Sequence, residues 1–309
     1  MNIQDYVDRG RKACEQIKDY NQEQVDKLVY AAAKIIYQNA EPLAKHAVEE
    51  TGLGFYKDKI AKNTDTPAAF WDYLKDKKSV GIIGENKKTG IIEVAHPVGV
   101  IACITPATNP TVTPLGNFMD AIKGKNAIIV SAAPRAAKTT TETVNLIRKA
   151  IGALGAPEDL IQILDEVTLE NSQALMKACD LIIATGGSGM VKAAYSSGTP
   201  AYGVGPGNPP VVLDRDYDIT EAAKKTVVAV GSDNGILCDG DNQLLYPEDK
   251  EKELFDALKK EGVVIFEKKA DVDAFAKVLF HDGKANSALV GKDAPVIAEV
   301  AKDMGILTV

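Results

Sequence analysis

Short apolar runs alternate with amphipathic stretches over most of the chain. From residue 98 onward, strand-sized apolar runs are separated by longer stretches in which apolar residues recur at helical spacing. Short, continuously apolar strands that alternate with helices are typical of a parallel sheet covered on both faces. The sequence therefore predicts an α/β fold. The predicted strands are VGVIACI, NAIIVS, LIQIL, DLIIAT, PPVVLD, NQLLYP, GVVIF and SALVG.

The first third of the chain is predicted to open with helices. One follows from apolar residues at helical spacing between residues 25 and 36, and a second covers residues 42–51, with Pro42 in its first turn and Gly52 at its end. GIIEVA, at residues 90–95, adds a β segment. Residues 306–309 (ILTV) begin another apolar run, which fits a terminal strand or a truncated end. The further predicted helices cover residues 113–123, 136–154, 169–177, 189–197, 219–230, 247–261, 272–279 and 294–304.

Composition narrows the class of protein. The 309 residues are 45% apolar and 26% charged, with a net charge of −7 that is spread along the chain. This balance favours an ordinary soluble protein and argues against a nucleic-acid partner. No apolar run approaches the roughly 18 residues that span a bilayer, and no signal region opens the chain, so a cytoplasmic location and no membrane partner are expected. The four cysteines form no CxxC pair, which argues against a structural zinc site and a disulfide framework; no metal is expected.

A cysteine in an unusual setting is the first candidate for chemistry. Cys238 lies in GSDNGILCDG, where a glycine-containing bend passes into an acidic one, whereas an ordinary core cysteine would sit inside an apolar run. Thiolates are strong nucleophiles, although most lone cysteines are small buried hydrophobes. The motif alone therefore leaves both a catalytic and a structural role open.

A second candidate is Asn109, in ITPATNPTVT, between a predicted strand and a predicted helix. Loops at the carboxyl ends of parallel strands are where α/β sheets place ligands, and Pro110 favours an extended conformation at Asn109. A carboxamide fixed there can donate to a developing oxyanion. The alternative is an asparagine that caps the helix or shapes the turn.

Three further segments follow strands, and two of them are rich in glycine or proline. ATGGSGMVKAA places a strand-to-helix turn where backbone N–H groups can bind a phosphate, although a plain turn is an equal alternative. SAAPRAAK presents Arg135 either to a phosphate or ribose or simply to solvent. GVGPGNPP contains no ionisable group. The histidines, His46, His96 and His281, show no ligand or triad spacing and are expected to be structural.

Four segments, taken in their order along the chain, resemble the CoA-acylating branch of the aldehyde dehydrogenase superfamily. The nearest likeness is the aldehyde dehydrogenase half of bifunctional aldehyde–alcohol dehydrogenases. The segments are ITPATNPT, SAAPRAAK, ATGGSGMVKAAYSSGTPAYGVGPGNPPVV and DNGILC. The resemblance covers the chain from about residue 23 to its end. It implies a Rossmann-like dinucleotide-binding domain with N-terminal helices at residues 1–230, and an α/β catalytic domain from residue 231 to 309 that is incomplete. It also implies that the family continues beyond this chain at the C-terminus.

The resemblance assigns roles to particular residues. Cys238 matches the catalytic nucleophile, and Asn109 matches the asparagine that binds the substrate oxygen, together with the Cys238 backbone N–H. A larger set matches positions around the cofactor, although the lysine that hydrolytic relatives carry beside the adenosine ribose is absent. The predicted cofactor-binding residues are Thr105, Pro106, Ser131, Pro134, Arg135, Thr185, Gly186, Gly187, Ser188, Gly205 and Gly207.

The resemblance also implies the reaction. Hydrolytic aldehyde dehydrogenases carry a glutamate that activates water, and Val204 stands at the matching position. Val204 cannot act as a base, so the sequence favours transfer of the acyl group to CoA. The implied enzyme converts a small aldehyde, CoA and NAD+ (with NADP+ an open alternative) reversibly into acyl-CoA and NADH through a cysteine thioester, and is a homo-oligomer at full length. Acetaldehyde, propionaldehyde, succinic semialdehyde and sulfoacetaldehyde remain open as substrates. The alternatives are a non-catalytic fragment that at most binds dinucleotide or CoA, and a hydrolytic enzyme.

Overall fold

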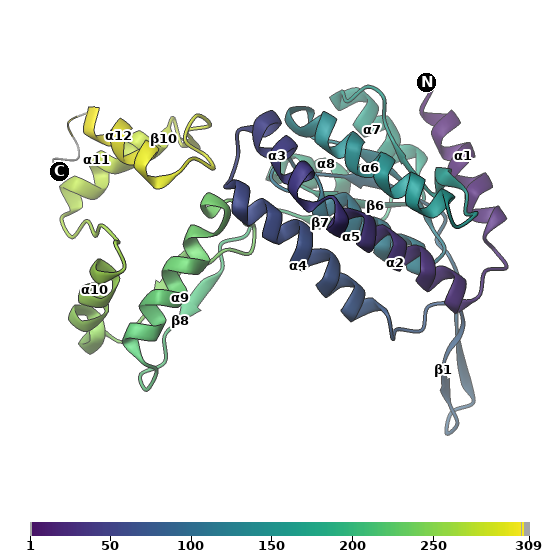
Figure 1. The fold of residues 1–309 in the computed structure, drawn as a ribbon, viewed down its shortest axis with the longest axis horizontal. Helices are drawn as coiled ribbons and strands as arrows, with labels where there is room; N and C mark the ends of the chain where they lie inside the picture. Colours follow the sequence, from purple (N-terminus) through teal and green to yellow (C-terminus); the bar gives the residue numbers. More distant parts are fainter. Residues whose placement is uncertain (1, 304, 306–309) are drawn as a thin grey trace. The chain divides into compact units, whose positions relative to one another are not determined.

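The computed structural model describes residues 2–303 and 305, and the chain divides into two compact units (Figure 1). The first consists of residues 1–51 and 59–206. The second consists of residues 52–58 and 207–309. None of the helices among the described residues combines the length and apolar character that crossing a lipid bilayer requires.

A five-stranded parallel sheet forms the centre of the first unit. Its strand order, β5-β4-β3-β6-β7, reverses direction at β3, as in doubly wound dinucleotide-binding folds. Strands β3 and β4 are buried throughout, which explains why their sequences are continuously apolar. The predicted α/β, Rossmann-like fold is thus confirmed. The strands are β3 (Val100–Ile104), β4 (Ala127–Ser131), β5 (Ile161–Ile163), β6 (Leu181–Thr185) and β7 (Ala201–Val204).

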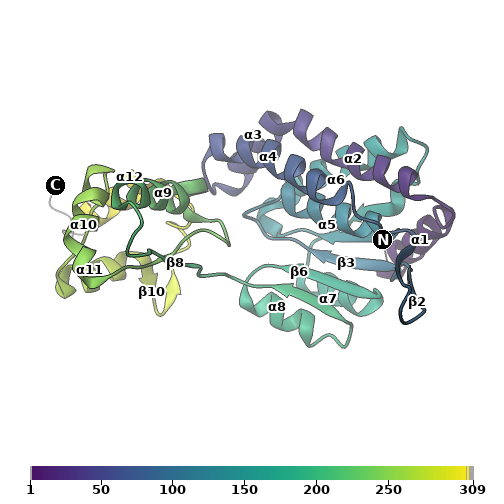
Figure 2. The same ribbon diagram turned by 90° about the horizontal axis from the view of Figure 1, so that it is seen from below.

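Helices cover both faces of this sheet. Helices α5 and α6 lie on one side of β3 and β6, and α7 and α8 lie on the other (Figure 2). The larger apolar cluster joins α2, α5 and α6 to the sheet, and a second joins α1, α7 and α8 to its opposite face. Sequence patterns missed α1 and α4. The helices are α1 (Ile3–Gln16), α2 (Gln22–Gln38), α3 (Ala40–Thr51), α4 (Tyr56–Leu74, which crosses the unit boundary), α5 (Val112–Lys123), α6 (Ala137–Gly152), α7 (Leu169–Ala178) and α8 (Ser188–Tyr195).

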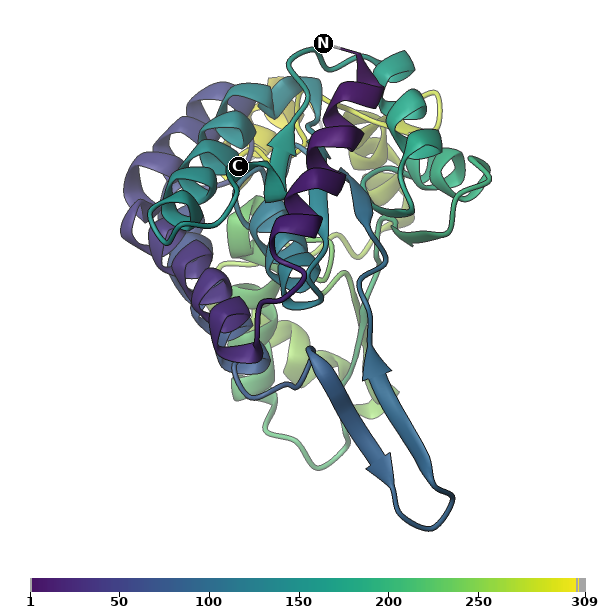
Figure 3. The ribbon, with the colours of Figure 1, turned by 90° about the vertical axis from the view of Figure 1, so that its right-hand side faces the viewer.

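An antiparallel hairpin projects from the first unit (Figure 3). It consists of β1 (Gly81–Asn86) and β2 (Ile91–Ala95), joined by a turn in which Gly90 has a φ of 71°. The predicted β segment at residues 90–95 is β2. Its partner β1 was not predicted: its side chains are mostly exposed, and glycines stand on both sides of its two isoleucines in GIIGEN.

The second unit contains two small apolar clusters. In the first, the parallel pair of β8 and β9 packs with α9 and α10, and in the second α11 packs with α12. Two predicted strands are wrong: residues 262–266 and 287–291 form no strand. Val263 and Ile265 instead pack their side chains on the first cluster. The elements are β8 (Pro210–Val212), α9 (Ile219–Gly231), β9 (Gln243–Leu245), α10 (Glu251–Lys260), α11 (Lys269–Leu279), β10 (Phe280–His281), β11 (Lys284–Ala285) and α12 (Ala294–Asp303).

The boundary between the compact units lies at residues 206 and 207. The division into a dinucleotide-binding domain at residues 1–230 and a catalytic domain at residues 231–309 stays a prediction. Residues 207–230 join the second unit because Leu213, Ile219 and Ala223 bury their side chains against Leu254 and Leu258 of α10. The predicted helix at residues 294–304 is α12, which ends at Asp303. The predicted run at residues 306–309 lies outside the described residues.

Candidate active site

The first unit brings four candidate segments to one edge of its sheet. Ile104 is paired with Ser131 on one side and Ala184 on the other, and Thr185 is paired with Val204. Because these strands are parallel, the loops that follow them emerge at the same edge, where α/β sheets bind ligands. The predicted cofactor residues at this edge are Thr105, Pro106, Ser131, Pro134, Arg135, Thr185, Gly186, Gly187, Ser188 and Gly205.

The turn between β6 and α8 leaves backbone groups accessible. Gly187 is the residue before the helix, and no side chain caps the first turn. A Cβ atom added at Gly187 or Gly189 would meet nothing within 4 Å, so the space beside these residues is open. Uncapped N–H groups at a helix N-terminus favour an anion through hydrogen bonds and the helix dipole. The turn therefore fits a phosphate or pyrophosphate.

The residues that follow β4 divide between buried and exposed positions. The Ser131 hydroxyl is buried and shares a hydrogen bond of 2.8 Å with the Ser172 hydroxyl of α7. Pro134 and Arg135 are exposed on the short turn before α6. Ser131 is therefore engaged within the fold, whereas Arg135 is accessible to an anionic group.

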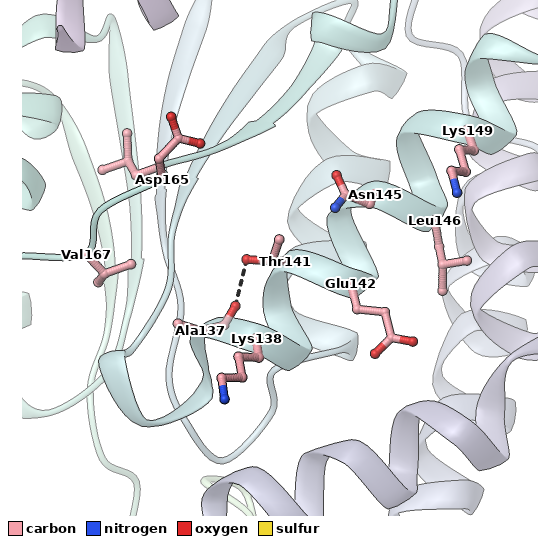
Figure 4. A pocket seen from close by; sticks show the side chains of 10 residues that line it. Ala137, Lys138, Thr141, Glu142, Asn145, Leu146, Lys149, Asp165 and Val167 are labelled. Carbon is pink, nitrogen blue, oxygen red and sulfur yellow. Dashed lines mark hydrogen bonds between the residues drawn. The ribbon is translucent and has the colours of Figure 1, made fainter. Parts of the chain in front are cut away.

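A pocket of about 680 Å³ runs along α6, from Ala137 to Lys149 (Figure 4). It lies between that helix and the segment after β5, so Lys138 and Asp165 both line it. Within its wall the Thr141 hydroxyl donates to the Ala137 carbonyl at 2.7 Å, which ties that side chain to its own helix. Neither Lys138 nor Asp165 stands out in the sequence, although each follows the carboxyl end of a strand.

The loop after β3 contains an unusual hydroxyl. Thr105 is only 3% exposed, and its Oγ1 is the one buried side-chain oxygen or nitrogen that has no hydrogen-bond partner among the described residues. An unsatisfied buried hydroxyl costs about 1–3 kcal/mol, so native proteins rarely keep one without a reason. Its position, directly before the Asn109 loop, makes this hydroxyl a candidate to bind a ligand at this edge of the sheet.

Helix α4 holds the Asn109 side chain. The Lys62 ammonium donates to Asn109 Oδ1 at 2.8 Å, and the Lys59 ammonium donates to the carbonyl oxygen of Thr108 at 2.7 Å. Thr111 rather than Asn109 precedes α5, and no side chain caps that helix. The carboxamide is therefore not a helix cap. Neither lysine was singled out from the sequence.

Cys238 belongs to the second unit, and so does Gly207. Cys238 is exposed, whereas Cys103 and Cys179 are buried. Burial raises the pKa of Cys103 and of Cys179 to about 12 in each case, so both thiols stay protonated at neutral pH. A Cβ atom at Gly207 would lie 2.2 Å from the Cys238 carbonyl oxygen. Only glycine fits this approach, so the backbone of residue 207 packs directly against the cysteine.

A left-handed turn precedes Cys238. Asp233, Asn234 and Gly235 have φ values of 50°, 57° and 69°. Side-chain hydrogen bonds hold the two non-glycine residues in this conformation. Asp233 accepts from the Phe55 N–H at 2.9 Å, and Asn234 donates to the Gly291 carbonyl at 3.1 Å and to the Asp293 carboxylate at 2.7 Å. Strained backbone of this kind persists only where its surroundings enforce it, and it clusters at functional sites.

Residues 1–270 match the family described as the aldehyde dehydrogenase family. The chain belongs to the aldehyde dehydrogenase family. The match covers the whole first unit and the part of the second unit that carries Cys238.

Relatives of this aldehyde dehydrogenase chain include CoA-acylating enzymes, which confirms the predicted resemblance. The chain is 44% identical over 301 residues to succinate-semialdehyde dehydrogenase (acetylating) of Clostridium kluyveri. The match covers 97% of this chain and 66% of that protein. An acetylating aldehyde dehydrogenase structure from Geobacillus thermoglucosidasius matches with a TM-score of 0.92 and 37% identity, covering 97% and 67%. A propionaldehyde dehydrogenase structure from Rhodopseudomonas palustris, with bound CoA and an acylated cysteine, matches with a TM-score of 0.84 and 29% identity, covering 100% and 69%. The chain thus spans about two thirds of each relative.

Proposed function

We propose that this chain carries the nucleophile and the dinucleotide-binding part of a CoA-acylating aldehyde dehydrogenase, which reversibly converts a small aldehyde, CoA and NAD+ into acyl-CoA and NADH. The observation that carries the proposal is the setting of Cys238. It is an exposed thiol behind a strained turn, in a chain whose Cys103 and Cys179 are buried and held protonated.

In this proposal the Cys238 thiolate attacks the aldehyde carbon, and the carbonyl π electrons move to the oxygen. The Asn109 side-chain N–H and the Cys238 backbone N–H stabilise that oxyanion. One such donor contributes about 2.7–4 kcal/mol to transition-state stabilisation in other enzymes. NAD+, when bound, supplies the hydride acceptor that oxidises the adduct to a thioester on Cys238. The CoA thiol then takes the acyl group and releases the cysteine.

Val204 supports CoA over water as the acyl acceptor. It ends β7, its side chain is partly exposed, and it has no atom that could accept a proton. Hydrolysis of a thioester at neutral pH needs a general base to activate water, whereas a thiol is a better nucleophile without one. The CoA and the acylated cysteine of the Rhodopseudomonas relative agree with this choice.

Two features of the first unit fit a dinucleotide. The open, uncapped turn at Gly187 suits the pyrophosphate, and the unpartnered Thr105 hydroxyl offers a hydrogen bond at the same sheet edge. We assign the adenosine end to the pocket that contains Lys138 and Asp165, beside the exposed Arg135. Arg135 leaves NADP+ as an alternative to NAD+, because a guanidinium suits a 2′-phosphate.

A homo-oligomer remains part of the proposal. The hairpin of β1 and β2 exposes Ile82, Ile91 and Ile92, each by more than half. Val94 pairs with Ile82 and lies two residues from Ile92, so these three exposed side chains share one face of the hairpin. Exposed apolar patches are typical of protein–protein contacts. Their presence supports the expectation of association between copies of the chain.

The stoichiometry of the reaction tests the proposal. The chain is incubated with NAD+ and acetaldehyde, propionaldehyde, succinic semialdehyde or sulfoacetaldehyde, with and without CoA. We expect NADH and acyl-CoA in equal amounts, and none without CoA. Free acid formed without CoA would favour the hydrolytic alternative. Binding of dinucleotide without turnover on any aldehyde would favour the non-catalytic alternative.

A further inference from the structure

Side chains on one face of α4 hold the loop that contains Asn109 in place. Lys59, Lys62 and Asn63 are three and four residues apart, so they share a helix face. Lys59 and Asn63 are both buried. The Asn63 carboxamide accepts from the Thr111 hydroxyl at 2.6 Å and donates to the Ala40 carbonyl at 3.0 Å. Together with Lys59 on Thr108, this contact fixes the loop on both sides of Asn109.

Lys62 differs from Lys59 and Asn63 because it contacts the side chain of Asn109 and not only the loop around it. It reaches the Asn109 side chain itself, 2.8 Å from Nζ to Oδ1. A lysine ammonium has three donors and no acceptor, so only the oxygen of a carboxamide can face it. The lysine thereby determines which way the amide is turned. With Oδ1 engaged by Lys62, the NH2 group must point elsewhere.

The NH2 group of Asn109 is left available by this arrangement. Among the described residues the structure gives Asn109 Nδ2 no hydrogen-bond partner. The residue is half-buried, so part of its side chain is accessible to a ligand. A cation bound to the amide oxygen also polarises the amide and makes its N–H groups stronger donors. The same contact therefore orients the donor and strengthens it.

We propose that Lys62 is a positioning residue for the oxyanion donor: it holds the Asn109 carboxamide in the one orientation that presents Nδ2, and its charge strengthens that donor. The inference rests on the proposed function, in which Asn109 stabilises the oxyanion. Lys62 itself contacts no substrate atom in this account. Its effect on turnover passes through Asn109.

The first test observes the side chain directly and does not depend on turnover. In the full chain labelled with ¹⁵N-asparagine, the Asn109 side-chain NH2 signals are identified by their loss in Asn109→Ala. We expect both signals to move in Lys62→Met and to return toward their original positions in Lys62→Arg. Lys75→Met is the matched control, since Lys75 pairs with Asp72 and should leave the signals in place. Unchanged signals in Lys62→Met would overturn the proposal.

The second test uses turnover. Lys62→Met should lower kcat for acyl-CoA formation by about 10-fold or more, part of the loss expected for a missing oxyanion donor, with KM for the aldehyde nearly unchanged. In an Asn109→Ala background the same change should cost less than about 2-fold, because residues that act as a unit are not additive. Equal losses in both backgrounds would refute the coupling. If Asn109→Ala alone leaves kcat unchanged, the proposed oxyanion role fails, and the NMR result still decides whether Lys62 orients the amide.

Discussion

The left-handed turn before Cys238 reverses the usual order of stability between a glycine and an alanine substitution. At most positions alanine is more stabilising than glycine, because glycine loses more conformational freedom on folding. Asn234 has a φ of 57° and a ψ of 35°, which is left-handed helical backbone. There the order should reverse, so that Asn234→Gly is more stable than Asn234→Ala.

The magnitude follows from the contacts of Asn234. Both substitutions remove the hydrogen bonds to Gly291 and Asp293, which together contribute about 2 kcal/mol at about 1 kcal/mol each. Alanine additionally bears the left-handed backbone, which costs a non-glycine residue about 1–2 kcal/mol. Asn234→Gly should therefore lower the free energy of unfolding by about 2 kcal/mol, and Asn234→Ala by about 3–4 kcal/mol.

Urea unfolding followed by circular dichroism compares the two variants. Asn171, in the first turn of α7, is the matched control. The backbone of Asn171 is ordinary helix, so Asn171→Ala should be more stable than Asn171→Gly by about 1 kcal/mol. If alanine at residue 234 proves equal to glycine or better, the turn is not left-handed in solution, and the argument that strain sets the cysteine loop fails.

Three more predictions concern packing and the other thiols. Gly207→Ala should destabilise the chain by about 1–3 kcal/mol in urea and slow acylation of Cys238, because the new methyl group meets the Cys238 carbonyl; an unchanged midpoint and rate would show that the contact is absent. Glu50→Ala should lower the unfolding free energy by about 2 kcal/mol, since this carboxylate accepts the first N–H groups of α6, whereas Glu50→Gln should cost less. Iodoacetamide at a pH of about 8 should modify Cys238 and spare Cys103 and Cys179, whose raised pKa keeps them protonated, as peptide mass mapping will show; faster labelling of either buried thiol would contradict their burial.

Much of the sheet could be predicted from the sequence. Strands β3 and β4 are buried on both faces, so their runs are continuously apolar and unmistakable. The hairpin strand β1 could not be predicted in this way, because its side chains are mostly exposed. Residues 262–266 are apolar enough for a strand, but Val263 and Ile265 pack their side chains on the core without forming one. A buried loop segment and a buried strand can have the same apolar sequence, so the pattern alone could not distinguish them.

The candidate site was predictable only in part. Asn109 and Cys238 stand out because proline and glycine frame them in the sequence. Lys59 and Lys62 do not stand out, since lysines on a helix are usually solvated. Their roles arise from a contact with a loop almost fifty residues away along the chain, which no local pattern encodes. The Thr105 hydroxyl is similar: its lack of a partner is a property of the folded state alone.

Acyl transfer from acetyl-CoA to the cysteine tests the central claim most directly, because this half-reaction needs no dinucleotide. The chain and its Cys238→Ser variant are incubated with acetyl-CoA, and the peptides are mapped by mass spectrometry. We predict one acetyl group, on Cys238 and absent from the variant, which added CoA removes as acetyl-CoA. Acetylation of another residue, or none on Cys238 while the chain remains folded, would contradict the account.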